Sequence, residues 1–145
     1  MSVVKFILDG MELSSTSDQT ILEAALKNGV YIPNLCHHPD LKPVGVCRLC
    51  LVEVEGRRPV VSCMTHVQEG MVVTTESKPI TSMRKMTMSL LLANHEGDCL
   101  TCAKEGKCKL RELSSYMGIE DEDINRLRSS PRNIAKDESN PFFTI

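Results

Sequence analysis

The sequence predicts an α+β fold, in which a small mixed sheet crossed by one helix precedes a mainly helical segment. Short β-rich runs lie near residues 3–14 and 51–75, and one amphipathic helix falls between them. After Ser77 the apolar residues repeat at helical spacing instead, and Pro79 suits the first turn of a helix. These observations divide the chain of 145 residues into two parts.

The first part contains short runs that alternate or are rich in β-branched residues, which favours strands. They are Val3–Leu8, Met11–Ser14, Leu51–Glu55, Val60–Cys63 and Met71–Thr75. Asp9-Gly10 predicts a tight hairpin between the first two runs, and a glycine at position 56 predicts a turn between the third and the fourth. The pattern therefore predicts a sheet of four or five strands.

The helix of the first part begins after Thr20, whose hydroxyl caps the first turn while Glu23 reaches back to the backbone. Apolar residues follow at helical spacing. Asn28-Gly29 ends the helix, because glycine readily takes the left-handed conformation. The chain then enters a long loop rich in Pro, Gly and His.

The second part opens with a helix that we expect to run from Pro79 to about Ala93 or His95 and to end near Gly97. Its predicted core face is an apolar stripe at helical spacing. The stripe consists of Ile80, Met83, Met86, Thr87, Leu90 and Leu91. We interpret the methionines as packing residues rather than as metal ligands, because Met commonly fills irregular cores.

A further helix is predicted from about Cys108 to Tyr116, with Gly118 as its stop signal. Residues 119–145 are polar and weakly periodic, which predicts a solvated connector with room for a short helix over Asp123–Arg128. The closing run Pro141–Ile145 is apolar, so we expect it to dock on this chain or on a partner.

The composition limits how the chain can be stabilised and where it can reside. With no Trp, two Tyr and three Phe it has little material for a large core, and such small domains use metals or disulfides. Seven cysteines cannot all pair within one chain. The sequence has no secretory signal pattern and no apolar run near the ~20 residues that span a bilayer. We therefore expect a cytoplasmic protein without membrane insertion, whose thiols bind metal.

The charge distribution argues against nucleic acid as a partner. The formal net charge is −2, and the Lys and Arg residues are scattered instead of forming a basic stripe with aromatic platforms. A cysteine nucleophile would need a base and an orienting acid, which the clustered thiols lack. We also find no glycine-rich phosphate loop or nucleophile elbow. Proteins or small molecules are the expected partners.

One cysteine set lies in the first part. Cys36, Cys47, Cys50 and Cys63 have the spacing C-x10-C-x2-C-x12-C. Three lie in one loop and the fourth follows two strand-like runs, as in plant-type [2Fe–2S] ferredoxins, although the first gap is longer here. The loop from Lys42 onward is suited to aim backbone N–H groups inward, where they would stabilise cluster sulfides.

The second set lies where one predicted helix gives way to the next. His95, Cys99, Cys102 and Cys108 form the pattern H-x3-C-x2-C-x5-C. Together the two sets use all seven cysteines and one of the four histidines, which gives two complete four-ligand sites. This economy indicates two metal centres.

Several alternatives remain open on the residues alone. Zinc accepts four thiolates, or three thiolates and an imidazole, although zinc sites usually pair two short knuckles and each set here has one. His37 or His38 could replace Cys36 as a ligand, as in a Rieske centre, but a thiol would then be unused. His66 is interpreted as a surface or packing residue.

At residue level the chain resembles a known family over roughly residues 3–118. The run from Thr20 to Gly56, the Ser62-Cys63 pair and the run from Leu90 to Leu110 resemble the amino-terminal part of the large iron–sulfur subunit of respiratory complex I. They are equally similar to the same region of NAD(P)-linked iron-only hydrogenases and NAD-dependent formate dehydrogenases.

The resemblance implies a β-grasp [2Fe–2S] ferredoxin-like domain over residues 1–77, whose cluster is held by the first cysteine set. It implies a small helical domain over residues 78–118, in which one histidine and three cysteines, the second set, hold a [4Fe–4S] cluster. Residues 119–145 would form a connector or docking tail.

Relatives of this kind continue into two further [4Fe–4S] motifs and a catalytic domain. Here the chain stops where those motifs would begin, so we expect either a stand-alone electron-carrying subunit or a fragment, without a catalytic centre of its own. The resemblance implies an electron relay in a hetero-oligomer. Its partners would be a flavoprotein that oxidises NAD(P)H and a catalytic hydrogenase, formate dehydrogenase or quinone-linked subunit. The rival hypotheses are a zinc-stabilised interaction module and an autonomous oxidoreductase.

Overall fold

The computed structural model describes residues 2–95 and 99–128. Five strands form its sheet: β1 (Val3–Leu8), β2 (Met11–Thr16), β3 (Leu51–Val54), β4 (Val60–Val61) and β5 (Val72–Thr74). Their order in the sheet is β2-β1-β5-β3-β4. β1 pairs antiparallel with β2 and parallel with β5, while β3 runs antiparallel to both β5 and β4. The predicted mixed sheet is confirmed.

Four strands differ from the predicted bounds, β3 by one residue at its end and β5 by one residue at each end. β2 extends to Thr16, because its pairing with β1 continues as far as Val3 opposite Thr16. β4 ends at Val61 instead of Cys63. The backbone N–H of Ser62 donates to the carbonyl of Cys50 at 3.0 Å, and a turn follows that carries Cys63 out of the ladder.

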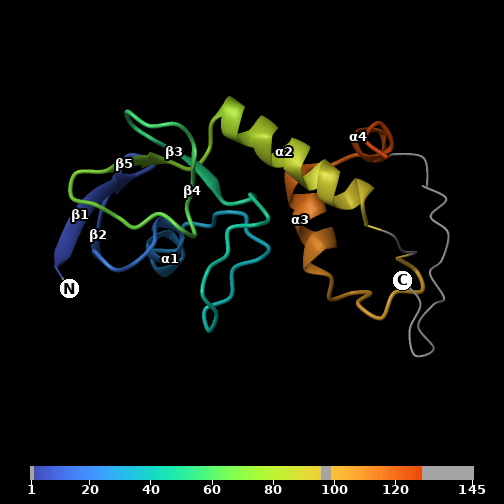
Figure 1. The fold of residues 1–145 in the computed structure, drawn as a ribbon, viewed down its shortest axis with the longest axis horizontal. Helices are drawn as coiled ribbons and strands as arrows, with labels where there is room; N and C mark the ends of the chain where they lie inside the picture. Colours follow the sequence, from blue (N-terminus) through green and yellow to red (C-terminus); the bar gives the residue numbers. More distant parts are fainter. Residues whose placement is uncertain (1, 96–98, 129–145) are drawn as a thin grey trace, which may run out of the picture.

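The helix α1 (Ile21–Lys27) covers one face of the sheet (Figure 1). Thr20 caps it as predicted: its Oγ1 accepts from the N–H of Glu23 at 3.3 Å, and Glu23 Oε2 accepts from the N–H of Thr20 at 2.8 Å. Gly29 follows the helix with a φ of 77°, which confirms the predicted left-handed end.

The long helix α2 (Lys78–Ala93) leaves the sheet region and reaches toward the second set of predicted ligands (Figure 1). Ser77 caps its first turn by accepting from the N–H of Ile80 at 3.3 Å. The described residues of α2 confirm its predicted extent, whereas the predicted stop at Gly97 lies outside the described residues.

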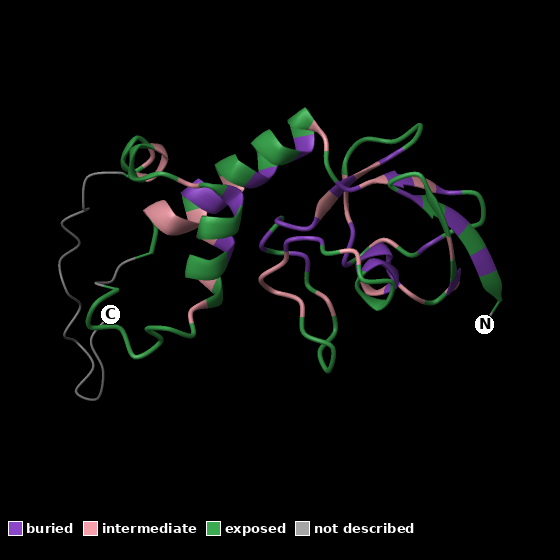
Figure 2. Cartoon of the chain, turned by 180° about the vertical axis from the view of Figure 1, so that it is seen from behind, coloured by how far each residue is buried: buried purple, intermediate pink, exposed green. Residues whose placement is uncertain are grey.

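The predicted core stripe of α2 is wrong for three of its six members. Met83, Met86 and Leu90 are 44%, 47% and 46% exposed. The residues that α2 buries lie on a different line along the helix, as the narrow buried band in Figure 2 shows. They are Ile80, Arg84, Met88 and Ser89. The apolar stripe missed this face because two of its four residues are polar.

Two shorter helices follow, α3 (Lys109–Met117) and α4 (Asp121–Asn125). Gly118 ends α3 in the left-handed region with a φ of 60°, as predicted. The short helix predicted over Asp123–Arg128 instead begins at Asp121, since Glu120 and Asp123 form a capping box there. The predicted docking of residues 141–145 lies outside the described residues.

The structure contains two apolar cores. The first lies between the sheet and α1, and its largest fully buried side chains include Phe6, Leu8, Ile21 and Leu22. The second joins the cysteine-rich loop to α2 and α3. It consists of Cys47, Leu49, Met88, Leu113 and Met117, with partly buried neighbours that include Leu35, Cys36 and Ile119. The loop that carries three predicted ligands is therefore packed against the helical part.

None of the helices among the described residues is long and apolar enough to cross a bilayer.

Candidate metal centres

The first cysteine set lies at one end of the sheet. Cys36, Cys47 and Cys50 belong to the long loop between α1 and β3, and Cys63 lies in the turn after β4. Cys47, Cys50 and Cys63 are 6%, 1% and 1% exposed, and Cys36 is half-buried. The fold thus shields three of the four thiols from water and leaves the fourth nearer the surface.

The thiols of the first set approach one another in two pairs. The side chains of Cys36 and Cys47 form a hydrogen bond, as do those of Cys50 and Cys63. Burial raises the pKa of Cys63 to about 12, and the hydrogen bond and charge of Cys50 raise it as well. Cys36 and Cys47 also lie near enough to raise the pKa of Cys63 through their charges. Because thiolates at such short range would repel each other, deprotonation of these cysteines would require a bound cation as the counter-charge.

Backbone N–H groups of the loop point at two of the sulfur atoms. Burial raises the pKa of Cys36, but hydrogen bonds from the backbone of Cys47 and Val46 outweigh it, so its pKa is lowered overall. Burial raises the pKa of Cys47, and hydrogen bonds from the backbone of Leu49 and Leu35 oppose that rise without cancelling it. The sequence-based expectation that this loop aims its N–H groups inward is therefore met at both sulfurs.

Buried polar atoms without a hydrogen-bond partner in the protein provide a further test of whether the first cysteine set suits a bound cluster. Among the described residues they are His37 Nδ1, Ser62 Oγ and Arg84 Nε. His37 adjoins Cys36 and Ser62 adjoins Cys63, and the charge of Cys50 acts on Arg84. Buried polar atoms are nearly always paired, and orphans call for an explanation such as an ion that the protein holds. Two of the three belong to residues that adjoin a ligand of this set in the sequence, which fits a polar inorganic group bound there.

The second set is presented by helix ends. His95 follows the last turn of α2, and Cys108 is the residue that precedes the first turn of α3. Cys99 and Cys102 are exposed in the connecting segment, where the N–H of Lys104 donates to Cys102 Sγ at 3.4 Å. Within the described part of the chain, no three His, Cys, Asp or Glu side chains are arranged to hold a single metal ion. The ligand assignments stay predictions.

The remaining histidines occupy other roles. His66 is exposed and pairs with Thr20 in an isolated bridge between their backbones, so its interpretation as a surface residue is confirmed. His38 is exposed, and its Nδ1 lies 3.7 Å from Asp40 Oδ2. The pairing of Cys36 with Cys47 leaves Cys36 within the thiol cluster, which favours the cysteine over either neighbouring histidine as the ligand.

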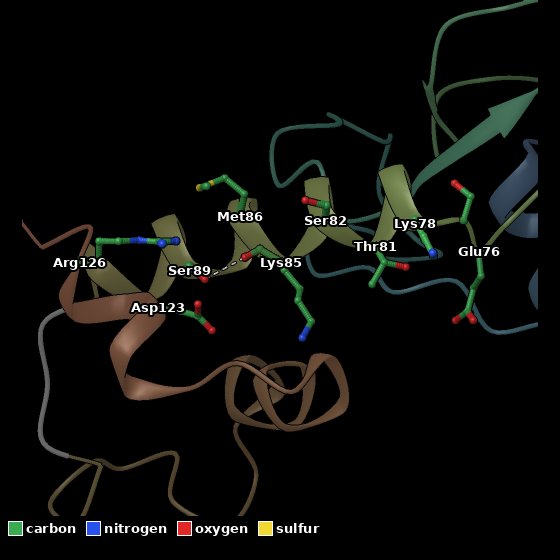
Figure 3. A pocket seen from close by; sticks show the side chains of 10 residues that line it. Glu76, Lys78, Thr81, Ser82, Lys85, Met86, Ser89, Asp123 and Arg126 are labelled. Carbon is green, nitrogen blue, oxygen red and sulfur yellow. Dashed lines mark hydrogen bonds between the residues drawn. The ribbon is translucent and has the colours of Figure 1, made fainter.

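A cavity of about 630 Å³ lies away from the cysteines, between α2 and α4 (Figure 3). Its described lining is polar and carries both signs of charge, for example Lys85, Asp123 and Arg126, and includes neither a cysteine nor a histidine. It lacks the apolar walls with a few converging polar groups that small-molecule sites usually have.

Comparison with known proteins gives the decisive observation. A family profile described as a 2Fe-2S iron-sulfur cluster binding domain matches residues 2–78, which is more than half of the chain. The chain belongs to this iron–sulfur family. A second profile, described as the iron-sulfur binding region of NADH-ubiquinone oxidoreductase-G, matches residues 84–123. Each predicted ligand set falls within one of the two matched segments.

Relatives of this iron–sulfur chain are subunits of larger enzymes. An NADH-quinone oxidoreductase subunit of Rickettsia typhi is 35% identical over 142 residues, which cover 97% of this chain and 21% of that protein. The NADP-reducing hydrogenase subunit HndD of Solidesulfovibrio fructosivorans is 40% identical over 126 residues, covering 82% of this chain and 21% of that protein. The chain spans about a fifth of the length of both relatives.

A solved structure is also similar. An NAD+-reducing [NiFe]-hydrogenase in its H2-reduced state matches with a TM-score of 0.79 and 35% identity, over 95% of this chain and 57% of that chain. The resemblance to complex I and hydrogenase subunits is confirmed. The two matched segments give this iron–sulfur chain one [2Fe–2S] and one [4Fe–4S] cluster, as predicted. They support an electron-transfer protein over a zinc-stabilised interaction module.

Sequence reasoning missed some residues around the first site. Arg84 and Ser62 were not singled out as site residues, although both have a buried polar atom without a hydrogen-bond partner. Arg84 lies four residues after Ile80 and four before Met88, so a helical wheel places it on the buried face. That signal was available, but a charged residue is normally read as marking the solvent side.

Proposed function

We propose that Cys36, Cys47, Cys50 and Cys63 hold the [2Fe–2S] cluster of this chain. The observation that carries this assignment is the pairing of Cys36 with Cys47 and of Cys50 with Cys63, which the fold brings together from a loop and a strand end. Backbone N–H groups around Cys36 and Cys47 supply hydrogen bonds that favour the thiolate form. Leu49, fully buried beside these cysteines, keeps water from the inner side of the site.

His95, Cys99, Cys102 and Cys108 are the proposed ligands of the [4Fe–4S] cluster. Support comes from the donor set, three thiols and one imidazole, and from its position between the end of α2 and the start of α3. A rigid helix end on each side would fix His95 and Cys108, while the glycine-punctuated segment between them lets the other two thiols converge.

The division into a ferredoxin-like domain of residues 1–77, a helical domain of residues 78–118 and a tail of residues 119–145 belongs to the same proposal. Ser77, at the proposed boundary, caps α2 and donates from its Oγ to Glu53 Oε1 at 2.7 Å, so the boundary residue bonds to both parts. The second apolar core, which contains Cys47, Leu49 and Leu113, ties the two domains together. A shared core would keep the two sites at a fixed separation.

The proposed function is an electron relay in a hetero-oligomeric oxidoreductase. When bound, each cluster supplies a one-electron redox centre. The residues of the chain hold the two centres in series, exclude water from the inner site and tune both through hydrogen bonds and charge. We expect electrons to arrive from a flavoprotein that oxidises NAD(P)H and to leave to a catalytic hydrogenase, formate dehydrogenase or quinone-linked subunit, or to flow in reverse. A cytoplasmic location is part of the proposal.

The test is NADH-dependent reduction of the purified chain, followed by absorbance and electron paramagnetic resonance. We expect no reduction by NADH alone and rapid reduction once the co-purifying flavoprotein is added. Reduction by NADH without any partner would favour an autonomous oxidoreductase. Clusters that stay oxidised in the presence of the active flavoprotein would contradict the proposed relay.

A further inference from the structure

Arg84 is a buried cation at the junction of the two parts of the chain. It lies on the inner face of α2 and is 4% exposed. Its Nη2 donates a hydrogen bond to the carbonyl of Leu51, the residue that follows Cys50. One side chain thus connects the long helix to the first cysteine set.

The guanidinium has fewer partners than a buried cation needs. Its Nε is buried without a hydrogen-bond partner, and in the described part of the chain no carboxylate forms an ion pair with Arg84. A buried charge is costly unless a charge of opposite sign lies nearby. A negative group close to the guanidinium would therefore offset the cost of burying Arg84.

The residues around the Arg84 side chain come from both parts of the chain. Arg84 lines a cavity of about 290 Å³ together with Pro33 of the first part and Tyr116 and Met117 of α3. Tyr116 packs edge-to-face on Tyr31, with ring centroids 5.3 Å apart, which closes the junction on one side. The junction is therefore built from both parts of the chain.

Four negative groups act on Arg84. Burial lowers the pKa of Arg84, while the charges of Glu76, Tyr116, Cys50 and Asp9 raise it, that of Glu76 most. Glu76 lines the same cavity but forms no ion pair with Arg84 among the described residues. Cys50 is 1% exposed, so its charge is poorly screened by water. Cys50, a proposed ligand of the [2Fe–2S] cluster, is thus a buried negative group next to Leu51, whose carbonyl accepts the hydrogen bond from Arg84.

We propose that Arg84 is a positioning residue of the [2Fe–2S] site, which fixes the Cys50–Leu51 backbone against α2 and supplies the positive charge that raises the midpoint potential of this cluster. This inference rests on the proposed function. Reduction adds one negative charge to the site, and a nearby buried cation stabilises the more negative form. Because the guanidinium is buried, salt in the solvent screens its effect only weakly.

Two substitutions separate the charge from the hydrogen bond. Arg84→Gln removes the charge but keeps an N–H donor for the Leu51 carbonyl, and Arg84→Lys keeps the charge. We expect Arg84→Gln to lower the midpoint potential of the [2Fe–2S] cluster in a redox titration followed by electron paramagnetic resonance, at low and at high salt. We expect Arg84→Lys to remain close to wild type, and the [4Fe–4S] potential to stay unchanged in both.

Lys85→Gln is the matched control, since it removes one cation from the next position of α2, where the side chain is exposed and donates to the Gly118 carbonyl at 3.3 Å. It should leave both potentials unchanged. A wild-type potential in Arg84→Gln would overturn the inference, as would a large shift in Arg84→Lys if the glutamine variant fails to assemble. A wild-type protein without a [2Fe–2S] signal would instead refute the proposed function.

Discussion

The side chain of Met64 lies directly against the Cα of Gly45, so closely that a Cβ at position 45 would overlap its sulfur. Gly45 has a φ of 63° and belongs to the loop between Cys36 and Cys47, while Met64 follows Cys63. This contact joins the two chain segments that carry the first cysteine set. The backbone conformation favours glycine here, and an added Cβ would force the Met64 side chain to move.

Gly45→Ala should therefore weaken the [2Fe–2S] site. A left-handed backbone costs an alanine about 1 to 2 kcal/mol, and the contact with Met64 adds to it. We expect faster loss of the [2Fe–2S] absorbance in the presence of a chelator. Gly56→Ala is the matched control, because Gly56 has a φ of 72° but nothing within 4 Å of the added Cβ. Equal rates for the two variants would show that the Met64 contact is unimportant.

Leu113→Ala tests the second apolar core. Leu113 is 1% exposed and belongs to the same buried cluster as Cys47 and Leu49. Truncation of a fully buried leucine lowers the free energy of unfolding by about 2 to 5 kcal/mol. Because the cluster spans both parts, we expect Leu113→Ala to accelerate loss of the [2Fe–2S] signal as well as to reduce stability in denaturant titrations. Leu90→Ala, at a position 46% exposed, serves as the control and should change little.

Cys99→Ala tests the assignment of the second ligand set. We expect it to remove the [4Fe–4S] signal in electron paramagnetic resonance and to spare the [2Fe–2S] signal. Cys63→Ala should have the reciprocal effect, since Cys63 contacts Cys50 in the other set. Loss of both signals in either variant would argue against two separately held clusters.

His95→Cys tests the role of the imidazole. A neutral imidazole leaves the site one unit less negative than a thiolate would, which favours reduction by simple electrostatics. We expect a His95→Cys protein that assembles its [4Fe–4S] cluster to show a lower midpoint potential for it. An unchanged or higher potential would count against the charge argument.

Much of the fold follows from local signals in the sequence. The hairpin at Asp9-Gly10, the capping box of Thr20 and Glu23, and the glycine stop at Gly118 all identify elements that the structure contains. These signals work because caps and turns depend on a few neighbouring residues. The predicted ligand sets rest likewise on short spacings, and each falls in its matched family segment.

The packing between the parts could not be predicted in this way. The buried face of α2 contains two polar residues, Arg84 and Ser89, besides Ile80 and Met88. A prediction based on the apolar residues alone therefore selected a different face of the helix. Arg84 is buried and donates to the carbonyl of Leu51, which belongs to a distant segment of the chain. Such long-range partners are absent from local patterns, which is why the junction emerges only from the structure.

The most direct test of the central claim is the metal and sulfide content of the protein purified without oxygen, combined with electron paramagnetic resonance after reduction. The account predicts about six irons and about six acid-labile sulfides per chain, with separate [2Fe–2S] and [4Fe–4S] signals. A well-folded protein with bound zinc and without acid-labile sulfide would contradict it.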